Sequence, residues 1–167
     1  MDRTNDNILS SIYVPYDKAK SIKIKCDMIC QPLPVNFEII EESREVVLLP
    51  VIIKDIEKFE IPDYITAVGD WAFEDCYKLQ DVMIPDSVKR IGEGAFHNCI
   101  SLQSVKLPTG LIIISDQTFA GCTSLENIEL GSDLKEIGNW AFSGTLISRN
   151  MILDTVKIIS DMAFENY

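Results

Sequence analysis

Hydrophobic and polar positions along most of this chain follow a unit that returns every 23 residues. A phenylalanine marks each unit, at Phe73, Phe96, Phe119, Phe142 and, one residue early, Phe164. A cysteine stands three residues after the phenylalanine in three of the units, at Cys76, Cys99 and Cys122. No heptad fits this spacing, so the period predicts stacked short coils and not a long helix.

Four more apolar columns keep this step and complete the inward side of each predicted coil. The two columns before the phenylalanine contain Ile65, Val88, Leu111, Leu134 and Val156, and Val68, Ile91, Ile114, Ile137 and Ile159. The two columns after the cysteine contain Leu79, Leu102 and Leu125, and Val82, Val105, Ile128 and Met151. One such coil cannot bury its own apolar side, so neighbouring coils stack and share one core. The pattern predicts a mostly β solenoid with a parallel sheet.

Glycine and proline punctuate the units where the predicted coil turns. Gly69, Gly92 and Gly138 follow the second apolar column, and Ser115 and Ser160 replace them elsewhere. Glycine permits tight or left-handed backbone, which we expect at these positions. Pro62, Pro85 and Pro108 stand where the predicted strand of each unit ends. Proline cannot donate to a ladder, so it is expected to end each strand.

The first third of the chain lies outside the clear repeat. Phe37-Glu38-Ile39 stands 22 residues before Phe59-Glu60-Ile61, and Val46 stands 22 before Val68, which is a weak echo of the unit. We predict an N-terminal, β-rich cap or degenerate repeat over residues 1–55 and a solenoid of four to five repeats over residues 56–167. A small separate β-domain is the rival interpretation of residues 1–55.

The unit also resembles a known family of repeats. The pattern AFxxCxxLxxVxIPxxVxxIGxx, carried by Gly94-Ala95-Phe96-His97-Asn98-Cys99 and the residues up to Pro108, is similar to the BspA or Treponema type of leucine-rich repeat. The resemblance implies a curved, right-handed solenoid with a parallel sheet on its concave face. It also implies protein–protein interaction, often in adhesion at a microbial cell surface.

Composition excludes several classes of partner. The formal net charge is -11, so nucleic acid and anionic membranes are unfavourable partners. The longest apolar run, Val46–Ile53, is far below the ~20 residues that cross a membrane. With no signal peptide visible, we expect an intracellular protein, or a surface or secreted protein of which this chain is a fragment.

No constellation of catalytic or metal-binding residues stands out. The five cysteines are an odd number, which favours reduced, packed thiols. Cys26 and Cys30 form a CxxxC pair without a nearby histidine, and His97 is the only histidine, expected on an exposed turn. We therefore predict a non-catalytic protein without cofactor or metal. Trp71 and Trp140 occupy equivalent positions, either covering the convex side or serving as exposed binding anchors.

The predicted sheet offers the surface for a hypothesis about binding. Side chains alternate along a strand, so the residues between the buried positions point outward. These outward residues form the candidate partner-binding concave face: Lys58, Glu60, Asp81, Met83, Ser104, Lys106, Asn127, Glu129, Asn150 and Ile152. The partner is expected to be a protein of unknown identity. The function of the module would then be cell-surface adhesion or host interaction, or alternatively that of an intracellular scaffold or adaptor. The last coil has no cap, which suggests self-association through the C-terminal end.

Overall fold

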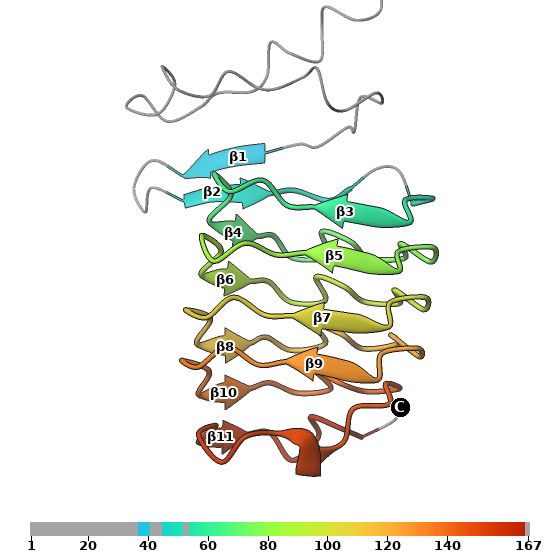
Figure 1. Cartoon of the computed structure of the whole chain (residues 1–167), viewed down its shortest axis with the longest axis vertical. Coiled ribbons are helices and arrows are strands. Elements are labelled where there is room, and N and C mark those ends of the chain that lie inside the picture. The colour runs from blue at the N-terminus through green and yellow to red at the C-terminus, as the bar shows by residue number, and fades with distance from the viewer. Residues whose placement is uncertain (1–36, 41–44, 52–53, 166–167) are drawn as a thin grey trace, which may run out of the picture.

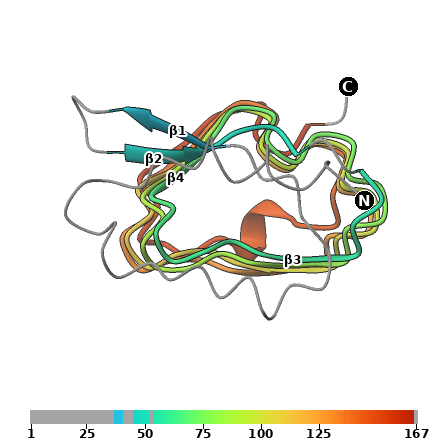
Figure 2. The ribbon, with the colours of Figure 1, turned by 90° about the horizontal axis from the view of Figure 1, so that it is seen from above.

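A computed structural model describes residues 37–40, 45–51 and 54–165 of the chain. The repeats wind into a solenoid of short coils stacked one above another (Figure 1). Seen from above, the chain runs clockwise while it descends, so the solenoid is right-handed (Figures 1 and 2). The period of the apolar columns thus predicted the architecture correctly, because a coil of this length closes only by stacking on its neighbours.

Each regular coil contributes one three-residue strand and one two-residue strand, on opposite sides of the core (Figure 2). The longer strands are β3 (Lys58–Glu60), β5 (Asp81–Met83), β7 (Ser104–Lys106) and β9 (Asn127–Glu129). The shorter strands are β4 (Ala67–Val68), β6 (Arg90–Ile91), β8 (Ile113–Ile114), β10 (Glu136–Ile137) and β11 (Ile158–Ile159). Neighbouring strands on each side are parallel, with β3 paired to β5, β7 to β9, and β10 to both β8 and β11.

The phenylalanine column forms the centre of the core. Phe73, Phe96, Phe119 and Phe142 are fully enclosed, and Phe164 packs against the cluster from the last coil. Successive rings are stacked nearly parallel, with centroids 5.0, 5.4, 5.7 and 5.4 Å apart. Such spacing lies within the favourable range for aromatic pairs, so each ring contributes both buried area and contact with its neighbours.

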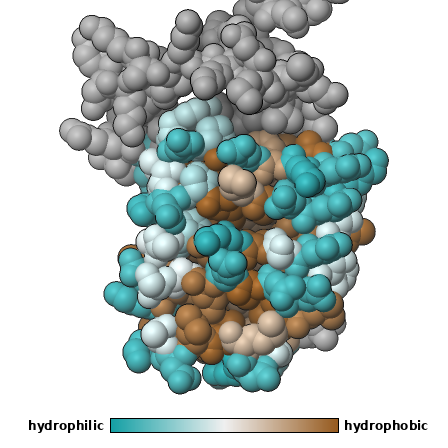
Figure 3. Space-filling model, in the orientation of Figure 1, coloured by the Kyte–Doolittle hydropathy of each residue, from teal (hydrophilic) through white to brown (hydrophobic). Residues whose placement is uncertain are grey.

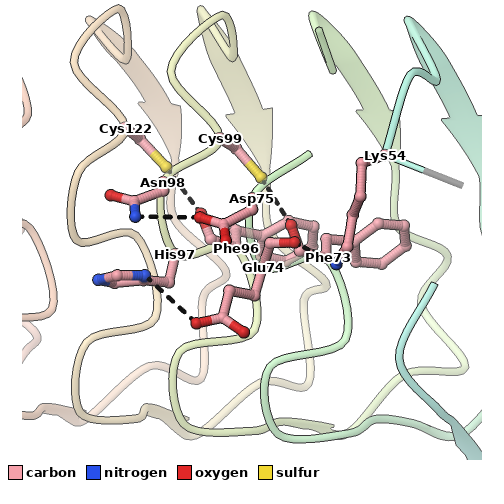
Figure 4. Close-up of polar contacts among 9 residues, drawn as sticks. All are labelled: Lys54, Phe73, Glu74, Asp75, Phe96, His97, Asn98, Cys99 and Cys122. Atoms are coloured by element: carbon pink, nitrogen blue, oxygen red, sulfur yellow. Dashed lines mark hydrogen bonds and ion pairs between the residues drawn. The ribbon is translucent and has the colours of Figure 1, made fainter. Parts of the chain in front are cut away.

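The cysteine column is also inward, as expected from the sequence. Cys76, Cys99 and Cys122 are buried free thiols. The Cys99 thiol donates to the Phe73 carbonyl oxygen at 3.2 Å, and the Cys122 thiol donates to the Phe96 carbonyl oxygen at 3.0 Å (Figure 4). The Cys99 and Cys122 thiols thereby link each coil to the preceding one, which is a structural role.

The glycines after the second apolar column are needed for close approach, not for left-handed backbone. A Cβ on Gly92 would lie 2.6 Å from the Asp70 backbone nitrogen, and one on Gly138 would lie 2.8 Å from the Asp116 backbone nitrogen. One left-handed residue comes two positions later in four of the coils, with φ between 51° and 57° at Trp71, Gly94, Gln117 and Trp140. A second left-handed position follows at Asp75, Asn98, Gly121 and Gly144. The expectation of tight or left-handed backbone at these glycines is therefore met by the tight approach of the preceding coil.

The first described strands form an antiparallel hairpin at the top of the stack (Figure 1). β1 (Phe37–Ile40) runs antiparallel to β2 (Glu45–Leu48), and β2 pairs in parallel with β4. Leu48, and not Val46, lies opposite Val68, so the 22-residue echo in the sequence is not the structural register. The Arg90 guanidinium reaches the Glu45 carboxylate, with Nη2 at 3.3 Å from Oε2. This ion pair joins β2 to β6 across the short side chain of Ala67.

The last coil departs from the others. A 3-10 helix, η3 (Arg149–Met151), stands where a fifth long strand was expected (Figure 1). Ile147 is buried, whereas Ser148, which occupies the leucine position by sequence spacing, is exposed. The inward anchor thus arrives one residue early, which agrees with the 22-residue step to Phe164. Thr145 takes the place of the cysteine, and its hydroxyl donates to the Phe142 carbonyl oxygen at 2.8 Å.

Candidate interaction surface

Eight of the ten residues predicted to bind a partner lie on the side of the stack that carries the β3–β5 and β7–β9 sheets, and we call its outer surface the long-strand face. Its residues are Lys58, Glu60, Asp81, Met83, Ser104, Lys106, Asn127 and Glu129, and all of them are exposed. The register places Lys58 opposite Asp81 and Glu60 opposite Met83. The middle residue of each strand points inward, so alternation along three-residue strands produces two outward columns.

The other two predicted residues, Asn150 and Ile152, do not belong to this face. Asn150 lies in η3, and Ile152, expected to point outward, is half-buried and packs against the core. Met151, expected to point inward, is exposed instead. The cause is the early anchor at Ile147, which shifts the inward positions of the last coil and leaves no strand here to carry the outward pair.

The charges of the long-strand face are largely paired within it. The Lys106 ammonium lies 3.0 Å from a Glu129 carboxylate oxygen, and the Lys58 ammonium lies 3.9 Å from an Asp81 carboxylate oxygen. The hydrogen bond and the negative charge of Glu129 raise the pKa of Lys106. Glu60 has no ion-pair partner within the described part of the chain. Both lysines of the face are therefore paired with carboxylates, whereas the Glu60 carboxylate is not paired with a lysine. The face as a whole is mildly acidic.

Met83 supplies the apolar element of the long-strand face. Its side chain is 61% exposed, and it stands between Glu60 and Lys106 in the column. Figure 3 shows this side of the molecule, where polar side chains alternate with apolar ones and no broad polar sheet or broad apolar sheet dominates. A flexible thioether among polar groups is suited to contact with a protein surface.

A second set of outward residues lies on the short strands and was missed at the level of sequence. We call it the short-strand face, and its residues are Lys89, Arg90, Ile112, Ile113, Lys135, Glu136, Lys157 and Ile158. A signal was available, because these residues form adjacent pairs that return at the repeat spacing. Each pair lies between the two inward columns that precede the phenylalanine, as Lys89 and Arg90 lie between Val88 and Ile91.

The turn around His97 gathers polar groups from successive coils (Figure 4). His97 was expected to be exposed, yet its ring is half-buried, edge-to-face with Trp71 at 5.5 Å between centroids. Its Nδ1 atom lies 3.9 Å from Glu74 Oε1. Asn98 donates to the Asp75 carboxylate at 3.1 Å, which links two successive coils. Among residues 54–165 and the described cap, no group of three or more metal-ligating side chains converges.

Burial favours the protonated form of two of the thiols, Cys76 and Cys99. Burial, with a smaller contribution from Cys99, raises the pKa of Cys76 from 9.0 to about 12. A hydrogen bond with Cys122, together with burial, raises the pKa of Cys99 well above its ordinary value. A neutral thiol is a poor nucleophile and a poor metal ligand. The CxxxC pair, Cys26 and Cys30, lies outside the described residues.

Known proteins give the same architecture. A T. pallidum leucine rich repeat protein superposes with a TM-score of 0.71 at 26% identity, over 78% of this chain and 64% of its own. A leucine-rich repeat protein from Bacteroides ovatus superposes with a TM-score of 0.69 at 31% identity, over 78% of this chain and 37% of its own. A leucine-rich repeat protein from Bacteroides capillosus superposes with a TM-score of 0.60 at 27% identity, over 77% of this chain and 94% of its own. The chain thus spans less than two thirds of the first two structures. No curated protein matches it.

The sequence profile of the BspA type leucine rich repeat region matches residues 53–167 in six copies. The chain therefore belongs to the BspA-type leucine-rich repeat family, as its phenylalanine and cysteine columns predicted. Leucine-rich repeat solenoids are generally protein-interaction modules and are typically not catalytic. In the described part of the chain, no helix is both long and apolar enough to cross a membrane.

Proposed function

We propose that this protein is a non-catalytic interaction module whose long-strand face binds another protein. The observation that carries the proposal is the contrast between the two kinds of column. Inward positions repeat nearly the same residue in each coil, whereas the outward column from β3 to β9 reads Glu60, Met83, Lys106 and Glu129. A surface that differs from coil to coil on a rigid frame is suited to recognising one particular partner.

The test separates binding from folding. Met83→Glu combined with Lys106→Glu places two new acids on the long-strand face without touching the core, because both side chains are exposed. We expect the double variant to lose a partner that the unchanged chain captures from its native extract, with a melting temperature close to that of the unchanged chain. Ile100→Glu with Lys78→Glu is a matched control, because both side chains are exposed on the turns outside the two faces. Equal capture by the double variant and the unchanged chain would remove the long-strand face from consideration.

The proposal places the module in cell-surface adhesion or host interaction, with an intracellular scaffold or adaptor as the alternative. The two settings differ in one accessible property. Protease treatment of intact cells removes an adhesion module and spares a scaffold, so an antibody against the repeats distinguishes them. Protection of the protein in intact cells, followed by digestion after lysis, would exclude adhesion.

A second proposal is self-association through the last coil. Four large apolar side chains that lie outside the two faces are exposed there: Leu146, Met151, Leu153 and Met162. Burying such a cluster against a second copy would remove apolar surface from water. Light scattering should show a dimer that Leu153→Glu with Met162→Glu converts to a monomer. A monomer at high concentration in the unchanged chain would contradict this proposal.

A further inference from the structure

The short-strand face differs in chemistry from the rest of this acidic chain. Its outward residues include four basic side chains and one acid, in a protein whose formal net charge is -11. Between the charges stand three branched aliphatic side chains, with 49% exposure at Ile112, 45% at Ile113 and 56% at Ile158. Single exposed isoleucines are ordinary, but three on one small sheet beside a local excess of positive charge are a feature to be explained.

The register shows that these residues form two continuous columns. Ile113 pairs with Glu136, and Glu136 pairs with Ile158. In the neighbouring column, the Lys135 amide donates to the Ile112 carbonyl at 2.9 Å, and the Lys157 amide donates to the Lys135 carbonyl at 2.8 Å. Ile112, Lys135 and Lys157 therefore follow one another across successive coils, and Glu136 stands between Ile113 and Ile158 in the adjacent column.

The upper and lower parts of this face differ in how their charges are satisfied. Lys89 donates to the Asp86 carbonyl oxygen at 2.7 Å, and Arg90 is paired with Glu45. By contrast, Lys135 and Lys157 form no ion pair with any acid in the described part of the chain. The half-buried Glu136 is the one acid in the columns. The lower part thus offers two free ammonium groups next to Ile112, Ile113 and Ile158.

We infer that the short-strand face is a second binding surface, which takes an extended acidic segment of a partner protein that also carries aliphatic side chains. The carboxylates of such a segment would pair with Lys135 and Lys157, and its aliphatic groups would cover the isoleucines. From Lys89 to Lys157 the face spans three steps between coils, about 14 Å, which an extended segment of about four to five residues matches. This surface is separate from the long-strand face, so the inference does not depend on the function proposed for that face.

The charge of the whole chain favours a protein segment over other anions. A membrane or a nucleic acid presents negative charge over a wide area, which the acidic remainder of this molecule repels. A short acidic segment brings its charge only to the basic columns, where the local attraction acts within a Debye length of about 8 Å. The isoleucines add contacts that a phosphate backbone would not use.

The experiment measures binding of a fluorescent peptide of alternating glutamate and leucine residues to the whole chain. We expect binding that weakens with added salt, and that falls by about tenfold or more in Lys135→Glu with Lys157→Glu. Ile112→Ser with Ile113→Ser should also weaken it, because the aliphatic contact is lost. Lys58→Glu with Lys106→Glu is the matched control, since it reverses two exposed lysines on the long-strand face and should leave the peptide bound.

Several results would overturn the inference. One is the absence of peptide binding to the unchanged chain, and another is an equal loss in the control variant. Equal binding of a peptide in which serine replaces leucine would remove the aliphatic requirement. Binding of phosphatidylserine vesicles or duplex DNA through the same lysines would assign the face to a different class of partner. Thermal unfolding of each variant confirms that a loss of binding is not a loss of fold.

Discussion

The inward and outward positions of one coil obey different rules. Inward, the same groups return in coil after coil, and the rings of Phe73, Phe96 and Phe119 overlap almost in parallel. Outward, neighbouring coils present unlike groups, and the two sheets differ even in the sign of their charge. A stacked coil must match its neighbours to bury its apolar side, whereas nothing requires its solvent side to match. Stability therefore depends on the repeated positions, and recognition is left to the variable ones.

The largest test of this contrast is a truncation in the aromatic stack. Phe119→Ala removes a fully buried ring between two stacked neighbours, so we expect the free energy of unfolding to fall by about 3–5 kcal/mol. Met83→Ala is the matched surface truncation and should change it by about 0.5 kcal/mol or less. Urea denaturation measures both. Comparable losses at the two positions would contradict the division of roles.

A smaller effect is expected where the backbone of one coil approaches that of the next. Gly92→Ala places a Cβ within 2.6 Å of the Asp70 backbone nitrogen, and the expected cost is about 1–3 kcal/mol. Gly144→Asn is the control, because a Cβ there would make only ordinary contact with the Gly121 backbone at 3.7 Å, and Asn98 holds the equivalent position at φ 57°. That control should stay within about 1 kcal/mol of the unchanged chain. An equally stable Gly92→Ala protein would show that the coils can separate slightly without loss.

The buried thiols predict a dependence of stability on pH. The pKa of Cys76 is raised from 9.0 to about 12 by burial, so the native thiol keeps its proton where the unfolded thiol loses it. The contribution of the protonated Cys76 thiol to the free energy of unfolding is thus complete below pH 9, and it is lost progressively as the pH rises toward 12. The free energy of unfolding should fall between pH 9 and 11, and less steeply in Cys76→Ala. Identical slopes for the two proteins would remove Cys76 as a cause.

The smallest change is expected at the ion pair between the cap and the repeats. Arg90→Ala breaks a partly exposed pair with Glu45, so the loss should be about 1 kcal/mol or less. Hydrogen exchange should locate that loss in β2 and not in the lower coils. Lys78→Ala, which breaks the exposed pair with Asp55, is the control and should leave exchange in β2 unchanged. Faster exchange throughout the stack after Arg90→Ala would mean that the cap holds the whole solenoid.

Sequence periodicity predicted the parts of this molecule that repeat. The phenylalanines, the cysteines and the outward residues of β3 to β9 were assigned correctly, because each position is repeated in several coils. The sequence also shows where the period fails, at Ser148 and in the 22-residue step to Phe164, but the structural consequence of that failure was not predicted. The 23-residue spacing puts Ser148 at the inward position, whereas the structure buries Ile147 one residue earlier. The predicted orientation of Asn150 and Ile152 was wrong for that reason.

Other features carry no periodic signal at all. The pairing of β1 with β2 is a single antiparallel contact, and the weak echo at Val46 suggested the wrong register. The left-handed positions were missed because tryptophan and glutamine, and not glycine, occupy three of them at Trp71, Gln117 and Trp140. There the stacked neighbours determine the backbone, overriding the local preference of the residue.

The most direct test of a function on the variable positions is oxidative footprinting of the methionines, with and without the captured partner. Met83 is 61% exposed on the long-strand face, and Met162 is 43% exposed on the last coil, so each reports on a different surface of one molecule. We expect the partner to slow oxidation of Met83 and to leave that of Met162 unchanged. Unchanged oxidation of Met83 in the complex would show that the partner binds elsewhere.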